Sequence, residues 1–224
     1  MPKKKKSDSN EIILEDNITK ATLIFLHGLG DNGSGFLFFA NELRKYISNL
    51  RIILPSAVEN KISINDSVTP CWFDITEYPI SKNYMDNGRY LNYSLEEIHK
   101  LIDKEIEKGV QPDKIFIGGY SQGAAMSLIA ALKHPVKLGG VIMLSGWIFK
   151  NTDLLNKPTN LPIFIGHGDK DKVVLYENAE NLNNVLSKSG FTDITFKRYK
   201  NMGHNTSTTE INDVIKWLSV NLAK

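Results

Sequence analysis

The hydrophobic positions of this chain follow two alternating patterns. Short, almost continuously apolar runs such as residues 21–26 are typical of strands that are buried on both faces of a sheet. Between them lie longer segments whose apolar residues recur every three or four positions, and these predict amphipathic helices. The predicted strands are 21–26, 51–54, 114–118, 140–144, 161–165 and 192–199, and the predicted helices are 35–46, 88–108, 124–132, 175–189 and 210–222.

The alternation of strands and helices indicates the fold class. It predicts an α/β fold with a mostly parallel central sheet and helices on both faces. The chain shows no internal repeat or linker, so we expect one domain over residues 18–224, without a large lid domain. Residues 55–87 form a long irregular segment, which in a compact domain is usually functional.

Charge is concentrated at the N-terminus. The 224 residues carry a net charge of +2, but Lys3–Lys6 supply four of the 27 basic residues, which leaves 23 against 25 acidic residues. The rest of the chain therefore has no basic excess that would indicate nucleic-acid binding. We expect residues 1–17 to form a disordered basic tail and lead-in. A weak attraction to anionic membranes or a role in nuclear import are alternatives to a simple solvated tail.

The cysteine content and the hydropathy of the chain bear on the cellular compartment of the protein. The single cysteine, Cys71, excludes an internal disulfide framework and suits a reducing compartment. No apolar run reaches the roughly 18 residues that a membrane helix needs, and no apolar segment follows the basic N-terminus as in a secretory signal. We therefore expect a soluble cytoplasmic protein.

One strand-to-helix junction carries a chemical motif. Residues 119–123 have the sequence Gly-Tyr-Ser-Gln-Gly and join the strand at 114–118 to the helix at 124–132. In this context Gly-x-Ser-x-Gly predicts a nucleophile elbow, a turn so sharp that small residues flank the serine. The same pattern also occurs by chance in loops, so the assignment of Ser121 as a nucleophile depends on partners downstream.

Candidate partners for Ser121 follow it along the chain. Their order, first Asp and then His, is the order of the catalytic triad in α/β-hydrolases. The strand at 161–165 leads into a turn with two candidate acids. The spacing His-Gly-x-x-Asp favours Asp171, which leaves Asp169 a turn-stabilising role. His204 lies between the last strand and the last helix, where the general base is expected, although an isolated loop histidine is more often a surface residue.

An acyl-transfer enzyme also needs hydrogen-bond donors for the oxyanion, each worth about 3 kcal/mol. The usual sources are the amide after the nucleophile and an amide in the loop after an early strand. Here these are the backbone amides of Gln122 and of Leu29, within the His-Gly-Leu-Gly-Asp sequence at 27–31. Glycines after a strand could also form only a tight turn.

Five segments together resemble the acyl-protein thioesterases of the phospholipase/carboxylesterase group of α/β-hydrolases. They are residues 26–31, 70–74, 118–123, 167–171 and 202–204, of which the Pro-x-Trp-Phe-Asp sequence at 70–74 is the most specific. The resemblance spans about residues 19–223. It implies the α/β-hydrolase fold and a serine hydrolase that removes long acyl chains from protein cysteines and often from lysophospholipids.

This chain departs from the family pattern at four positions of these motifs. Tyr120 stands where the family usually has Phe, and Ala124 where it has Gly. Lys172 and Leu175 occupy positions where prolines usually follow the acid. Some relatives carry a lipidated N-terminal cysteine, which this chain lacks.

Apolar side chains in the predicted loops suggest a groove for an acyl chain. Our candidates are Trp72, Phe73, Ile75 and Trp147, although large apolar residues are equally expected in the core. S-acylated proteins or lysophospholipids are the expected substrates, with at most peripheral membrane contact, no nucleic acid, and a homodimer as an open option. The mechanism needs no metal or cofactor. The alternatives are a carboxylesterase or lysophospholipase acting on small or lipid esters, and a non-catalytic binding protein of the same fold.

Overall fold

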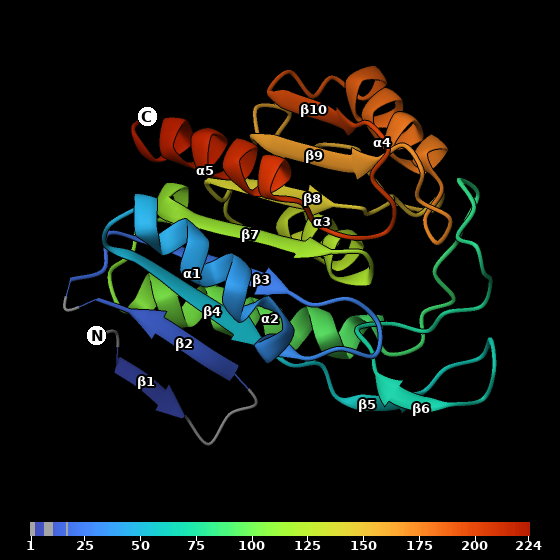
Figure 1. Cartoon of the computed structure of the whole chain (residues 1–224), viewed down its shortest axis with the longest axis horizontal. Coiled ribbons are helices and arrows are strands. Elements are labelled where there is room, and N and C mark those ends of the chain that lie inside the picture. The colour runs from blue at the N-terminus through green and yellow to red at the C-terminus, as the bar shows by residue number, and fades with distance from the viewer. Residues whose placement is uncertain (1–2, 7–10, 17) are drawn as a thin grey trace.

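The computed structural model describes residues 3–6, 11–16 and 18–224 (Figure 1). Within them, eight strands form one sheet in the order β1-β2-β4-β3-β7-β8-β9-β10. All neighbours from β4 to β10 are parallel, whereas β1 and β2 are antiparallel at one edge. The strands are β1 (Lys3–Lys6), β2 (Glu11–Glu15), β3 (Ala21–Leu26), β4 (Leu50–Pro55), β7 (Ile115–Tyr120), β8 (Gly140–Leu144), β9 (Ile163–Gly168) and β10 (Ile194–Tyr199).

Helices cover both faces of this sheet (Figure 1). Helices α1 (Leu37–Tyr46) and α5 (Thr208–Leu222) pack on one face; α2 (Leu91–Glu107), α3 (Gln122–Lys133) and α4 (Tyr176–Lys188) pack on the other. Side chains alternate along each strand, so Phe116 of β7 joins the core under α1 and α5 while Ile117 joins the opposite core. The short 3-10 helices η1 (Gly33–Phe36) and η2 (Pro112–Lys114) precede α1 and β7.

The predicted α/β class with a mostly parallel sheet is confirmed, and the predicted elements agree with the structure to within a few residues at their ends. The irregular segment at 55–87 contains a small hairpin that was not predicted, made of β5 (Glu59–Lys61) and β6 (Val68–Pro70). None of the helices in the described part of the chain is long and apolar enough to cross a bilayer.

The N-terminal prediction needs correction. Strand β2 pairs with β4, from Glu11 opposite Pro55 to Leu14 opposite Ile52, so part of the segment assigned to a disordered tail belongs to the sheet. The run Ile-Ile-Leu at 12–14 provides the apolar surface, and Leu14 is buried. The run was assigned to the tail because it is short and follows Lys3–Lys6 closely in the sequence. Residues 1–2, 7–10 and 17 of the predicted tail lie outside the described residues.

Candidate active site

Ser121 occupies a strained turn between β7 and α3. Its backbone φ is 54° and ψ is −119°, which a serine adopts only when the surrounding structure enforces it. The flanking glycines make this possible. A Cβ on Gly119 would lie 2.4 Å from the carbonyl carbon of Gly123, and a Cβ on Gly123 would lie 2.3 Å from the Leu26 oxygen of β3. The predicted elbow is therefore present, and it places the serine beside the end of β3.

The structure brings Ser121, His204 and Asp171 together. The Nε2 atom of His204 is 3.0 Å from Ser121 Oγ, and its Nδ1 is 2.6 Å from Asp171 Oδ2. An ionised carboxylate can only accept, so Nδ1 carries the proton and Nε2 is free to accept the serine proton. A backbone bond from Lys170 N to Met202 O, 2.9 Å long, ties the acid turn to the loop that holds the histidine.

Asp171 is held as an anion by three hydrogen-bond donors. The amides of Val173 and Val174 donate to its Oδ1, and His204 Nδ1 donates to its Oδ2. His167 Nε2, which is hydrogen-bonded to the Val174 oxygen, lies 3.3 Å from the same Oδ2. Burial by itself would raise the pKa of the Asp171 carboxyl. The close contacts with the His167 and His204 rings outweigh burial and hold that pKa well below its usual range. The negative charge is therefore available to stabilise a protonated His204.

Asp169, the competing acid, faces a different partner. Its Oδ2 accepts from Arg198 Nε and Nη2 at 3.1 and 2.9 Å, and its Oδ1 accepts from the amide of Asn201. The pKa of its carboxyl is lowered by the Arg198 hydrogen bonds. Asp169 thus stabilises the turn, as the spacing predicted, and Asp171 contacts the histidine.

The loop after β3 is fixed by the buried ring of His27. The Ala57 amide donates to its Nε2 over 2.9 Å, so its Nδ1 carries the proton and donates to the Gly28 oxygen. Burial lowers the pKa of this imidazole, which keeps it neutral. Farther along, Gly30 N donates to the Pro70 oxygen. These bonds fix the loop that carries Leu29, which lines the same cavity as Ser121 and Gln122.

The segment at 72–73 supports both oxyanion candidates. The indole Nε1 of Trp72 donates to the His27 oxygen over 2.9 Å. The Trp72 amide donates to Gln122 Oε1, and Gln122 Nε2 donates to the Phe73 oxygen, at 3.0 and 2.8 Å. Both polar atoms of the Gln122 carboxamide thereby hold this segment. Its backbone amide lies in the first turn of α3, where no helical carbonyl is available to accept from it.

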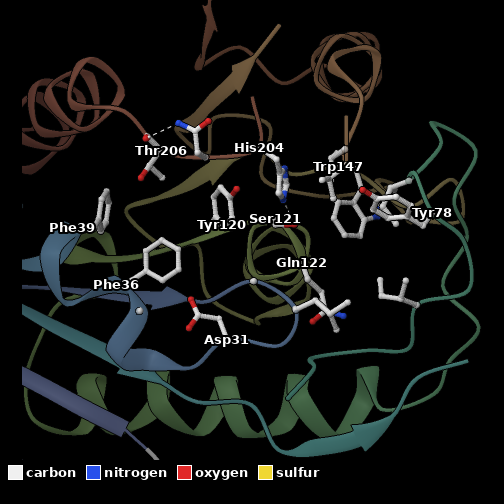
Figure 2. Close-up of a pocket in the computed structure, with 18 of the residues that line it drawn as sticks. Asp31, Phe36, Phe39, Tyr78, Tyr120, Ser121, Gln122, Trp147, His204 and Thr206 are labelled. Carbon is white, nitrogen blue, oxygen red and sulfur yellow. Dashed lines mark hydrogen bonds between the residues drawn. The ribbon is translucent and has the colours of Figure 1, made fainter. Parts of the chain in front are cut away.

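A cavity of about 560 Å³ opens at Ser121 (Figure 2). Ile75 and Trp147 line it, as predicted. The prediction that Trp72 and Phe73 line the groove is wrong for this cavity, because both side chains are buried behind it, where Phe73 packs edge-to-face on Trp147. Their sequence position beside the site is explained by the bonds to His27 and Gln122.

Sequence reasoning missed part of the cavity wall. Residues 36–39, Phe-Leu-Phe-Phe, were assigned only to a helix, yet three of them face the cavity. This aromatic run directly after the glycine-rich loop was the available signal. Val173 and Val174 also line the cavity, which their position after Asp171 could have indicated. Among the described residues, no three histidine, cysteine or carboxylate side chains gather so that they could hold a metal ion.

Comparisons with known proteins agree with this geometry. A family model described as Phospholipase/Carboxylesterase matches residues 7–222. Acyl-protein thioesterase 1 of Saccharomyces cerevisiae is 36% identical over 216 residues, covering 91% of this chain and 94% of the relative. A probable carboxylesterase SOBER1-like of Arabidopsis thaliana is 34% identical over 222 residues, covering 95% of this chain and 83% of the relative.

Solved structures show the same similarity. The crystal structure of Arabidopsis thaliana SOBER1 superposes with a TM-score of 0.83 at 31% identity, covering 90% of this chain and 99% of that one. The crystal structure of Zea mays acyl-protein thioesterase 2 gives a TM-score of 0.78 at 26% identity, covering 96% and 99%. The resemblance found in the sequence motifs is therefore confirmed, and the chain belongs to the phospholipase/carboxylesterase family of α/β-hydrolases.

Proposed function

We propose that this protein is a serine hydrolase that cleaves long-chain acyl thioesters from protein cysteines. The observation that carries the proposal is an unbroken series of hydrogen bonds, Ser121–His204–Asp171, at the base of a largely apolar cavity. Its relatives include acyl-protein thioesterases from several fungi, which supports a thioester of an acylated protein as the substrate.

In this mechanism Ser121 Oγ attacks the acyl carbonyl while His204 Nε2 takes its proton. Asp171 keeps Nδ1 protonated and stabilises the histidinium. The amides of Leu29 and Gln122 donate to the oxyanion as it forms. His204 then gives its proton to the departing thiolate, which leaves an acyl ester on Ser121. Water, deprotonated by His204, attacks that ester and releases the fatty acid and the free serine.

One side of the cavity suits the acyl chain. We define the acyl arm as Ile75, Tyr78, Ile80, Trp147, Val173 and Val174, which all line the cavity and come from the 55–87 segment, from the loop after β8 and from the acid turn. Each methylene that enters such a surface contributes about 0.8 kcal/mol of transfer free energy. Catalytic efficiency should therefore rise with chain length until the arm is full.

A carboxylesterase or lysophospholipase activity is the second candidate, favoured by the similarity to a probable carboxylesterase. Both reactions pass through the same acyl-enzyme, so the hydrogen bonds at Ser121 do not separate them. Peripheral membrane contact and a homodimer stay predictions from the sequence.

The test has two stages. Intact-mass spectrometry after fluorophosphonate treatment should give one adduct, which peptide mapping places on Ser121. Acyl thioesters and oxyesters of matched length, from two to sixteen carbons, are then assayed below their micelle concentrations. We expect kcat/KM for thioesters to rise well beyond four carbons. A steady decline beyond four carbons would favour a short-chain carboxylesterase, and an absence of labelling would favour a binding protein.

A further inference from the structure

The cavity extends from Ser121 in a second direction, away from the acyl arm. Figure 2 shows Phe36, Phe39, Tyr120 and Asp31 on one side of Ser121, with Trp147 and Tyr78 on the other. We call this second side the leaving-group arm, because an acyl chain in the acyl arm directs the other substituent of the carbonyl toward it. Its members are Asp31, Phe36, Phe38, Phe39, Tyr120 and Thr206.

Asp31 is the one carboxylate among the described residues that line the cavity, and no lysine or arginine lines it. Its Oδ1 accepts from the Asn32 amide over 2.8 Å, and none of the ion pairs in the described residues includes it. The carboxylate lies directly against Gly35, where a Cβ would be 2.2 Å from Oδ2. A glycine at this position therefore leaves the space that the carboxylate occupies.

Aromatic rings surround the rest of this arm. The rings of Phe36 and Tyr120 lie 5.7 Å apart between centroids, and Tyr120 in turn contacts the His204 ring at 4.9 Å. Phe38 leaves 68% of its surface exposed while lining the cavity. Aromatic faces and a carboxylate both attract cations, whereas an anion here would meet no positive side chain.

Building on the proposed thioesterase function, we propose that the leaving-group arm selects acylated cysteines that have a lysine or arginine beside them in the peptide. The ammonium or guanidinium group would lie against Asp31, the exposed ring of Phe38 and the part of the Phe36 ring that lines the cavity. Leaving groups that carry several negative charges, such as coenzyme A, are disfavoured by the same arrangement. Asp31 is thus a specificity-determining residue and takes no part in the bond-breaking steps.

The size of the effect follows from the exposure of the pair. A partly exposed ion pair, such as a substrate lysine beside Asp31, strengthens binding by roughly threefold. A glutamate in the place of that lysine would be repelled by Asp31 and weaken binding by a similar factor. Replacing a flanking lysine by glutamate should therefore lower kcat/KM roughly tenfold, with glutamine in between. The preference should shrink with added salt, since screening weakens exposed charge pairs.

The experiment uses S-octanoyl-cysteine peptides that differ only in a flanking Lys, Gln or Glu, with thiol release as the signal. Each is assayed with the wild-type protein, with Asp31→Asn, and with Glu107→Gln as a matched control. Asn keeps the shape and the acceptor of Asp31. Glu107 is an exposed carboxylate at the end of α2, near the start of β7, whereas Ser121 follows the other end of that strand. We expect the Lys-to-Glu ratio to fall to near one only in Asp31→Asn.

The ratio within one protein is independent of any general loss of activity in a variant. A wild-type ratio near one, or a ratio that survives in Asp31→Asn, would overturn this proposal and leave the thioesterase function standing. Faster hydrolysis of octanoyl-coenzyme A than of the Lys peptide would also overturn it. If no peptide thioester is cleaved while octanoyl oxyesters are, both proposals fail. Should Asp31→Asn not fold, the wild-type ratio at low and high salt decides alone, because a salt-independent ratio contradicts an ionic origin.

Discussion

The two sides of the reacting carbonyl are built in different ways. On the nucleophile side, the side chains of Ser121, His204 and Asp171 come from three separate loops and contact one another directly. On the proposed oxyanion side, the chemical groups are backbone amides, and they are held through contacts of Trp72, whose indole donates to the His27 oxygen and whose backbone amide donates to the Gln122 carboxamide. A substitution on the nucleophile side removes a reacting group. A substitution on the oxyanion side leaves the backbone amides in the chain and can only change their positions.

This difference predicts a ranking of effects, and Ser121→Ala should have the largest. Without the nucleophile no acyl-enzyme forms, so hydrolysis of an octanoyl thioester should drop about 10⁴-fold or more. Thiol-release assays and fluorophosphonate labelling measure this, with circular dichroism to verify the fold. Retained labelling in the variant would mean that another residue is the nucleophile.

The next effect separates the two aspartates. Asp171→Asn should lower kcat about 10³- to 10⁴-fold, because an amide in place of the carboxylate no longer fixes the His204 tautomer or stabilises its cation. Asp169→Asn should cost a few-fold at most, since it weakens the bond to Arg198 at the edge of the turn. Steady-state kinetics on both folded variants decides. A larger loss from Asp169→Asn would reverse the assignment of the acid.

A smaller effect is expected on the oxyanion side. Trp72→Phe keeps a ring in place but removes the donor to the His27 oxygen, which loosens the loop that carries the Leu29 amide. We expect kcat to fall about tenfold with little change in KM, because oxyanion contacts strengthen only in the transition state.

The matched control for this variant is Trp217→Phe. Trp217 of α5 is buried to a similar degree, lies outside the cavity and has no partner for its Nε1 in the described part of the chain, so kcat should stay within about twofold of the wild type. A loss in Trp72→Phe that grows with acyl length would instead show that Trp72 contacts the chain, as the sequence first suggested.

The same contrast explains what could be predicted from the sequence. Side-chain chemistry leaves motifs of fixed spacing, which is why Ser121, Asp171 and His204 were identified from their order along the chain. The role of Trp72 has no such signal. Its partner His27 is 45 residues away, and an aromatic residue in a loop predicts burial without specifying its contacts. The elements themselves were predictable because hydrophobic periodicity is local.

Strand β2 shows the limit of that local signal. Its apolar residues at 12–14 form a run of three, too short to be distinguished from a tail next to four lysines. Pairing with β4 makes this run part of the sheet. The leaving-group arm was missed for a related reason, since periodicity identifies residues 36–39 as helical but does not tell which of them face a cavity.

The last expected effect is on stability and not on rate, and it concerns a second buried carboxylate, Glu210, which sharpens the interpretation of Asp171. Both side chains are buried, but Asp171 accepts hydrogen bonds from three donors, whereas neither carboxylate oxygen of Glu210 has a partner among the described residues. Burial accordingly raises the pKa of Glu210 to about 8, while the pKa of Asp171 is lowered. Hydrogen-bond donors, and not depth, decide which carboxylate is an anion.

This contrast has a measurable sign. Folded Glu210 keeps its proton up to about pH 8, but the unfolded side chain releases it near its ordinary pKa of about 4.3. Between these values the folded state binds more protons, so the free energy of unfolding should decrease as the pH rises from about 5 to 8, by up to about 1.4 kcal/mol per unit. Glu210→Gln cannot ionise and should lose this contribution. Urea unfolding across that range, with Glu107→Gln as the exposed control, measures the difference. Equal slopes in Glu210→Gln and wild type would mean that Glu210 is ionised in the fold, and then a partner for its carboxylate must exist.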